Sequence, residues 1–210
     1  MPPPYCYDYP RPAVTVDLVA FTLIEGSLRV LLIRRDRPPF AGRWAFPGGF
    51  MEIEEPIEDA ARRELREETG FDLSAPISFL GVFGAPGRDP RGRTISMVYA
   101  VTVPAPIAKV RGGDDASEAR WIDPKEARDL AFDHDEILSR GLEWLQQALE
   151  VGPMVVPMLP QPFEASDVRR LFKTLGQSPS RASAWIKRLD KGGTISPVAN
   201  QEGFFRQVQE

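Results

Sequence analysis

The stretch that decides the fold runs from Gly49 to Phe71 and reads GFMEIEEPIEDAARRELREETGF. It predicts a helix over Ile57–Thr69, because its apolar residues recur at helical spacing. Pro56 stands at the first turn, where its missing N–H is harmless, and Gly70 is a typical stop signal. Both ends of the expected helix are therefore marked in the sequence.

Acidic side chains are arranged unusually on this helix. At about 100° per residue, Glu64 and Glu68 project on the protein-facing apolar side, Glu67 lies at its edge, and Arg62 and Arg66 project toward water. Glutamates three and four residues apart repel each other, so burying them is costly unless a positive group meets them. One or more divalent cations would fill that role. A solvated acidic face paired with arginines is the alternative, and the bare Glu-x-x-Glu-Glu triplet alone favours it.

The whole stretch resembles the Nudix box. That box reads glycine, five residues, glutamate, seven residues, Arg-Glu, an aliphatic residue, any residue, Glu-Glu, any residue, glycine, and an aliphatic or aromatic residue, and every defined position is filled here. The resemblance implies that Glu64, Glu67 and Glu68 bind Mg²⁺ or Mn²⁺, assisted by a backbone carbonyl near Gly48 or Gly49. It also implies hydrolysis of the pyrophosphate of a nucleoside diphosphate linked to another group.

The remaining box residues have structural roles under the same resemblance. Arg63 would pair with Glu55 and hold the loop-helix-loop shape, with Gly49 and Gly70 as its glycine positions. The fold implied is α/β: a Nudix α/β/α sandwich around a mixed sheet, over residues 1–150. Alternating apolar residues and helical spacing agree with it, and predict a second helix over Glu136–Glu150. The strands expected are Ala13–Leu23, Leu28–Arg34, Ile77–Phe83, Thr94–Val103 and Ala119–Asp123.

A general base is needed to take a proton from the attacking water. In the resembled family this base varies in position and often lies on a loop outside the box. Residues 112–121, GGDDASEARW, form the candidate loop. Asp114, Asp115 and Glu118 could supply the base or another metal ligand, and a solvated turn is the alternative for each.

The loop over residues 84–93, GAPGRDPRGR, is the candidate substrate-binding segment, because arginines suit phosphate recognition. Pro86 follows Gly70 by sixteen residues, which resembles the ADP-ribose subgroup of Nudix enzymes. A hairpin loop with solvated basic residues is the alternative. His134 is expected to have a structural or capping role. The candidate substrate-binding residues are Arg43, Pro86, Arg88, Arg91 and Arg93.

The composition bears on three other classes of protein: zinc-binding, disulfide-bonded and membrane or secreted proteins. Cys6 and His134 are the only cysteine and histidine, so a zinc site of the Cys/His kind is effectively excluded and no internal disulfide can form. The sequence has no apolar run near the ~18 residues of a membrane span and no visible secretory signal. These features favour a cytoplasmic protein.

The C-terminal part differs in composition from the rest. Residues 151–162 hold four prolines and no charge, which predicts a connector. Residues 161–210 carry eight Lys or Arg against five acids, a net +3, whereas the first 160 residues carry −7. Two helices, Ala165–Leu175 and Pro179–Asp190, and then two short strands are expected, Thr194–Val198 and Gly203–Val208.

This order resembles a winged helix over residues 163–210. The whole arrangement resembles the Nudix-related transcriptional regulators of NAD metabolism, which often have a degraded box and bind ADP-ribose without cutting it. Arg181, Lys187 and Arg188 are the candidate DNA-binding residues. Two hypotheses therefore stand: an ADP-ribose hydrolase, favoured by the intact box, and an ADP-ribose-responsive DNA-binding regulator. A homodimer is expected, since reading two half-sites needs two such segments.

Overall fold

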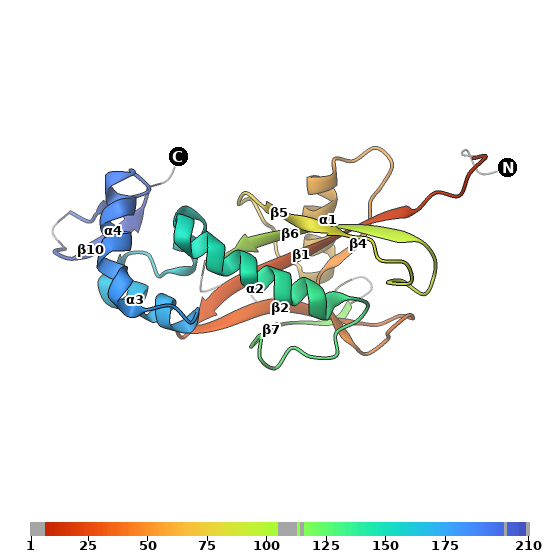
Figure 1. Cartoon of the computed structure of the whole chain (residues 1–210), viewed down its shortest axis with the longest axis horizontal. Helices are drawn as coiled ribbons and strands as arrows, with labels where there is room; N and C mark the ends of the chain where they lie inside the picture. The colour runs from red at the N-terminus through yellow and green to blue at the C-terminus, as the bar shows by residue number, and fades with distance from the viewer. Residues whose placement is uncertain (1–6, 105–112, 114–115, 200, 209–210) are drawn as a thin grey trace.

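The computed structural model describes residues 7–104, 113, 116–199 and 201–208. Its centre is a seven-stranded mixed sheet in the order β3-β2-β1-β6-β5, with β4 paired to β1 and β7 paired to β2 (Figure 1). β1 runs parallel to β6 and antiparallel to β2. The strands are β1 (Ala13–Ile24), β2 (Ser27–Arg35), β3 (Trp44–Ala45), β4 (Gly48–Phe50), β5 (Ser78–Phe83), β6 (Thr94–Thr102) and β7 (Ala116–Ile122).

Two helices cover the two faces of this sheet: α1 (Ile57–Thr69) and α2 (His134–Val151). The central strand β1 feeds a core on each face, because successive side chains of a strand point to opposite sides. Leu18 and Ala20 pack in the core that contains α1, and Val19 and Phe21 in the core that contains α2. The structure thus has the predicted sandwich around a mixed sheet.

The boundaries of α1 are those expected from the sequence, and Gly70 ends it in a left-handed conformation at φ 67°. The short strands β3 and β4 were not predicted. Arg62 is not simply solvated, because its guanidinium donates to the carbonyls of Leu73 and Ala75 and so holds the segment after the helix. The arginine side chain is long enough to start on the water-facing side of the helix and still reach backbone carbonyls in the segment that follows it.

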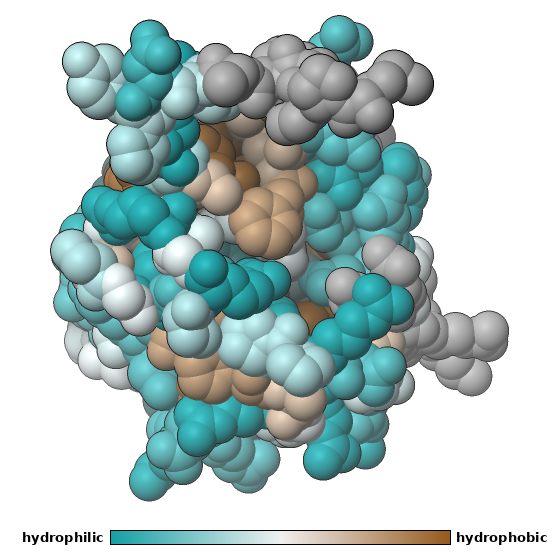
Figure 2. All heavy atoms as spheres, turned by 90° about the vertical axis from the view of Figure 1, so that its right-hand side faces the viewer, coloured by the Kyte–Doolittle hydropathy of each residue, from teal (hydrophilic) through white to brown (hydrophobic). Residues whose placement is uncertain are grey.

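The C-terminal unit, residues 163–208, lies at the end of the molecule away from the N-terminus (Figure 1). Figure 2 views the opposite end, where hydrophilic side chains predominate and smaller hydrophobic patches lie between them. The predicted second helix of the unit is divided into a short 3-10 turn and an α-helix. The elements are β8 (Phe163–Glu164), α3 (Ala165–Thr174), η2 (Pro179–Arg181), α4 (Ala182–Lys191), β9 (Ile195–Pro197) and β10 (Phe204–Gln207), with sheet order β8-β10-β9.

The expected connector is more than a spacer. Residues Pro153–Met158 form a 3-10 helix, η1, in which Val155 and Val156 are fully buried. They belong to the same hydrophobic core as α2 and as Val168 and Trp185 of the C-terminal unit. The unit therefore packs against the sheet domain through a continuous apolar core. No helix in the described part of the chain is long and apolar enough to cross a membrane.

Candidate active site

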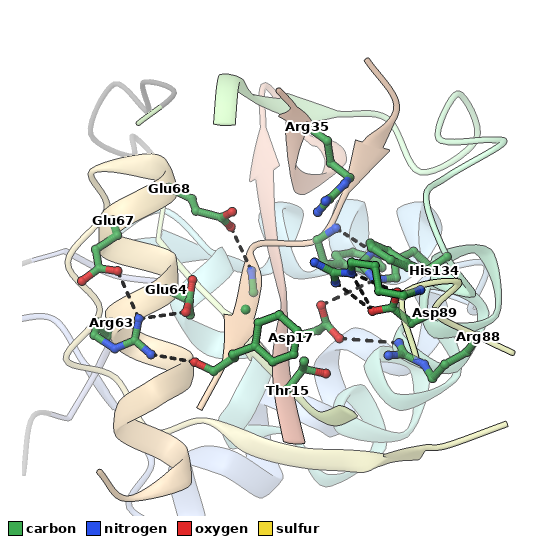
Figure 3. Close-up of a pocket in the computed structure, with 16 residues that line it drawn as sticks. Thr15, Asp17, Arg35, Arg63, Glu64, Glu67, Glu68, Arg88, Asp89 and His134 are labelled. Atoms are coloured by element: carbon green, nitrogen blue, oxygen red, sulfur yellow. Dashed lines mark hydrogen bonds and ion pairs between the residues drawn. The ribbon is translucent and has the colours of Figure 1, made fainter. Parts of the chain in front are cut away.

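A pocket of about 270 Å³ opens where β1 and α2 begin. Carboxylates from α1 form one wall and arginines from β2 and the β5–β6 loop form the other, with Asp17 of β1 between them (Figure 3). The sequence brings these segments together because β4 and β6 pair with β1 on either side of Asp17. The site therefore joins stretches that lie far apart in the chain, from Thr15 to His134.

Arg63 organises the carboxylate wall. Its guanidinium donates to both oxygens of Glu55, at 3.0 Å and 2.7 Å, and to the Phe50 carbonyl at 3.1 Å. It also donates to Glu64 at 2.8 Å and to Glu67 at 3.1 Å. Through the hydrogen bond from Arg63, the pKa of Glu55 lies below its usual value. The expected Arg63–Glu55 pair is present in the structure, and Arg63 fastens the loop before α1 to the helix.

Glu68 is the most buried of the three box glutamates, with 5% of its surface exposed. Its pKa is raised to about 8, chiefly by burial and in smaller part by the nearby negative charges of Glu64 and Asp17. The Gly48 N–H, which donates to Glu68 at 2.9 Å, and the charge of Arg35 act in the opposite direction. Burial also raises the pKa of Glu64. The ionised forms of these two carboxylates are thus disfavoured unless a further positive charge meets them.

The glycine pair before α1 permits this close packing. A Cβ on Gly49 would lie 2.5 Å from the carboxylate of Glu64, and one on Gly48 would lie 2.2 Å from the Val16 carbonyl oxygen. A side chain at Gly48 would collide with the backbone of β1, and one at Gly49 would displace the carboxylate of Glu64. The backbone at Gly48 and Gly49 therefore reaches the carboxylates only because these residues are glycines.

The chemistry of this donor set fits a hard divalent cation, since oxygen ligands with excess negative charge surround the pocket. Among the described residues, however, no three His, Cys, Asp or Glu side chains converge as a ready-made ligand set. Arg63 holds Glu64 and Glu67, and Glu68 is turned to the Gly48 N–H. Cation binding would therefore require these carboxylates to exchange hydrogen bonds for the ion.

Two of the predicted arginines lie on the opposite wall. Arg88 forms a bidentate pair with Asp133, at 2.6 Å and 2.8 Å, and 4% of its side chain is exposed. Arg91 forms a similar pair with Asp89 but keeps 44% of its side chain exposed. Against the effect of burial, Arg91 holds the pKa of Asp89 below its usual value. Arg88 is therefore buried and fixed in the pocket wall by Asp133, whereas the Arg91 side chain remains accessible to solvent.

The other predicted substrate residues lie outside the pocket lining. Arg43 stacks over Phe40, with 5.6 Å from the guanidinium carbon to the ring centre. Pro86 is exposed in the hairpin loop. Arg93 donates to the Gly84 carbonyl at the base of that loop. The third arginine of this wall is instead Arg35, which the arginine-rich loop gave no reason to expect.

Asp17 and His134 are further pocket residues, and sequence reasoning did not single out Asp17. Asp17 is 6% exposed, accepts a hydrogen bond from Ser96, and its Oδ1 lies 3.5 Å from His134 Nε2. The Phe46 N–H donates to His134 Nδ1 at 2.9 Å, which leaves the imidazole proton on Nε2, toward Asp17. Burial lowers the pKa of His134, so the ring is neutral at pH 7. A charged residue inside an apolar strand, as in TVDLVA, was the available signal.

One residue of the candidate base loop, Gly113, lies against the box helix. A Cβ on Gly113 would lie 2.5 Å from the Glu67 carbonyl oxygen, so the chain approaches α1 closely at this glycine. Asp114 and Asp115 lie outside the described residues. Glu118 lies on β7, forms an ion pair with Arg120, and is not among the residues that line the pocket.

The three candidate DNA-binding residues differ in their contacts. Arg181 forms a bidentate pair with the Glu150 carboxylate, and Arg188 donates to the Glu150 carbonyl. Lys187 is exposed on α4. Two of the three cations are thus engaged with the last turn of α2.

Comparison with known proteins agrees with this geometry. Residues 13–145 match the family model described as NUDIX domain. The ADP-ribose pyrophosphatase of Methanocaldococcus jannaschii is 43% identical over 136 residues, which are 65% of this chain and 76% of that protein. The ADPR responsive transcriptional repressor NtrR of Acinetobacter baylyi is 28% identical over 192 residues, 90% of this chain and 76% of that protein.

A solved structure extends the likeness to the C-terminal unit. The crystal structure of a MutT/nudix family protein from Enterococcus faecalis has a TM-score of 0.83 at 28% identity and covers 97% of this chain and 89% of that one. The family match spans more than half of the chain, including the whole box and both walls of the pocket. The chain therefore belongs to the NUDIX domain family.

Proposed function

We propose that this chain hydrolyses the pyrophosphate of ADP-ribose to AMP and ribose 5-phosphate. The observation that carries the proposal is the pocket itself, where a wall of box carboxylates faces a wall of arginines across a space of about 270 Å³. A diphosphate could meet guanidinium groups on one side and the cation site on the other. The 43% identity to an ADP-ribose pyrophosphatase supports ADP-ribose among nucleoside diphosphate derivatives.

The proposed cofactor is Mg²⁺ or Mn²⁺. Glu64, Glu67 and Glu68, with the Gly48 carbonyl, would hold it. A bound cation would neutralise phosphate oxygens and lower the pKa of a bound water. Among the chain's own residues, Arg63 keeps the box glutamates at the pocket and Arg88 fixes the wall near Asp133. The base would come from Asp114 or Asp115 of the candidate base loop, because Glu118 is paired with Arg120 outside the pocket lining.

The decisive experiment is a panel of nucleotides incubated with the full chain and magnesium, with release of AMP as the readout. ADP-ribose is expected to be the best substrate, and EDTA is expected to abolish turnover. Cleavage restricted to nucleoside triphosphates or dinucleoside polyphosphates would overturn the substrate proposal and leave the family unchanged.

A second candidate function is DNA binding under control of ADP-ribose. The observation that favours it is that similarity to a transcriptional repressor extends over 90% of this chain, including the C-terminal unit. Lys187 is available for phosphate contacts, and a homodimer would present two such units. Because Arg181 and Arg188 are engaged by Glu150, their contribution to DNA binding requires release from that residue.

Salt dependence tests this candidate. Lys187→Ala alone should reduce the slope of log affinity against log salt by about one unit, and the triple alanine variant of Arg181, Lys187 and Arg188 by up to about three. Light scattering on the same samples would report the expected homodimer. If the chain retains no duplex DNA at low salt, the regulator hypothesis is wrong.

A further inference from the structure

Phe132, in the loop between β7 and α2, lines the pocket in an unfavourable backbone conformation. Its φ is +56°, in the left-handed region, which is unfavourable for a bulky side chain. Three neighbouring contacts impose it: Ala131 N–H donates to the Trp44 carbonyl at 2.8 Å, His134 N–H to the Ala131 carbonyl at 3.1 Å, and Asp133 is paired with Arg88. The loop is thus held so that this ring faces the site.

The ring of Phe132 brings together residues from four segments. The guanidinium carbon of Arg35 lies 4.9 Å from the ring centre and that of Arg91 lies 5.7 Å from it. Phe40 meets the ring edge-on, with 4.9 Å between ring centres, and His134 lies 5.4 Å away. Phe132 is therefore a common neighbour of the two cations that come from β2 and from the β5–β6 loop.

Each arginine has a second anchor that fixes its direction. Arg35 Nε donates to the Pro39 carbonyl at 2.9 Å. Arg91 is held by Asp89, and its guanidinium also lies 5.1 Å from the centre of the Phe50 ring. Two guanidinium groups near one ring repel each other, and the negative face of an aromatic ring offsets part of that repulsion. Across the pocket from Arg35 lie the glutamates of α1 (Figure 3).

We propose that Phe132 is a positioning residue, whose ring gathers Arg35 and Arg91 so that both bind the phosphate oxygens of a nucleoside diphosphate. The inference rests on the proposed function in taking a diphosphate as the ligand. It also gives a function to the left-handed backbone conformation, in which the ring lies beside both cations. A leucine of similar bulk would fill the space without attracting them.

The test compares Phe132→Leu, which keeps the apolar bulk and the backbone strain, with Phe132→Tyr, which keeps the ring. Calorimetric titration of the full-length protein with inorganic pyrophosphate, and of the metal-free protein with ADP-ribose, measures binding without turnover. Phe132→Leu is expected to lower the affinity for both ligands roughly 5- to 30-fold, because two cation–π contacts are lost. Phe132→Tyr keeps the ring and is expected to bind both ligands with the affinity of the wild type. In hydrolysis, KM should rise by a similar factor while kcat changes less than about threefold.

Two controls separate positioning from packing. Phe79→Leu removes an exposed ring on β5 that contacts Tyr99 and does not line the pocket, and it should leave binding unchanged. In an Arg91→Met background, Phe132→Leu should cost less than in the wild type, because one partner is already gone. Equal pyrophosphate affinity in the wild type and Phe132→Leu, with ADP-ribose hydrolysis intact, overturns this inference alone. Weakened pyrophosphate binding without ADP-ribose hydrolysis overturns only the proposed substrate.

Discussion

The pocket and the C-terminal unit treat charge in opposite ways. At the pocket, Glu64 and Glu68 are held close to Asp17, and the pKa of Glu68 rises to about 8 through burial and these neighbours. In the C-terminal unit, the cations Arg181 and Arg188 are engaged with Glu150, and the buried residues of α4 are apolar apart from the Trp185 indole N–H, which donates to the Leu149 carbonyl.

The difference indicates that the pocket lowers the free energy of unfolding in order to bind a ligand, whereas the C-terminal unit does not. Buried like charges and a left-handed phenylalanine destabilise the metal-free protein, and a cation and an anionic ligand would relieve part of that cost. Paired charges around a continuous apolar core stabilise the protein without any ligand.

Removing Trp185 should produce the largest loss of stability. Trp185→Ala deletes a side chain that is 4% exposed and its hydrogen bond to Leu149, so the free energy of unfolding should fall by about 3–5 kcal/mol. Thermal denaturation should show a single transition shifted downward for the whole chain, because the core is continuous. A separate early transition limited to the C-terminal unit would contradict that view. Trp185→Phe, which keeps a ring, should cost clearly less.

Removing the charge of Glu68 should produce the largest loss of activity. Glu68→Gln keeps the shape of the side chain and its place beside Gly48 but removes one charge from the cation site. We expect kcat with magnesium to fall at least ~10²-fold, measured as AMP release. Activity within tenfold of the wild type would exclude Glu68 as a ligand. Glu58→Gln, an exposed glutamate on the same helix, is the matched control.

The same substitution should stabilise the metal-free protein at high pH. The folded pKa of Glu68, about 8, exceeds the ordinary value of 4.5, so its ionised form is penalised by folding. The wild type therefore loses stability as pH rises between these two values, and the loss is complete above about pH 8. In EDTA at pH 9, Glu68→Gln should be more stable by about 1–3 kcal/mol, with no difference near pH 4.5. Equal chemical denaturation midpoints at both pH values would refute this.

Breaking the clamp on Arg181 should have the smallest effect. Glu150→Gln weakens the bidentate pair and leaves more of the Arg181 guanidinium for solvent or DNA. If the chain binds DNA, the slope of log affinity against log salt should steepen by up to about one unit. Hydrolysis should be unchanged, since Glu150 lies at the far end of α2 from His134. A shallower slope would mean that the pair itself shapes the DNA-binding surface.

Local patterns were sufficient for the box helix and for most of the sheet. Pro56 and Gly70 mark the ends of α1, and alternating apolar residues predict β1 and β6 within one residue at each end. The Arg63–Glu55 pair was expected from the resemblance and is present. Such features depend on residues close in the chain or at fixed spacing, so they can be recognised before the fold is known.

Which residues meet at the pocket was decided by the tertiary structure. Asp17, Arg35 and Phe132 come from separate segments, and no pattern within any one segment indicates that the three meet at one pocket. Arg93 and Arg43 have the residue type expected of a phosphate-binding group, yet their hydrogen bonds and stacking place them elsewhere. Likewise, the proline-rich connector became core, because Val155 and Val156 find apolar partners in α2 and the C-terminal unit. The sequence by itself determined the helix and its carboxylates, whereas strand pairing and long-range packing decided which groups face them.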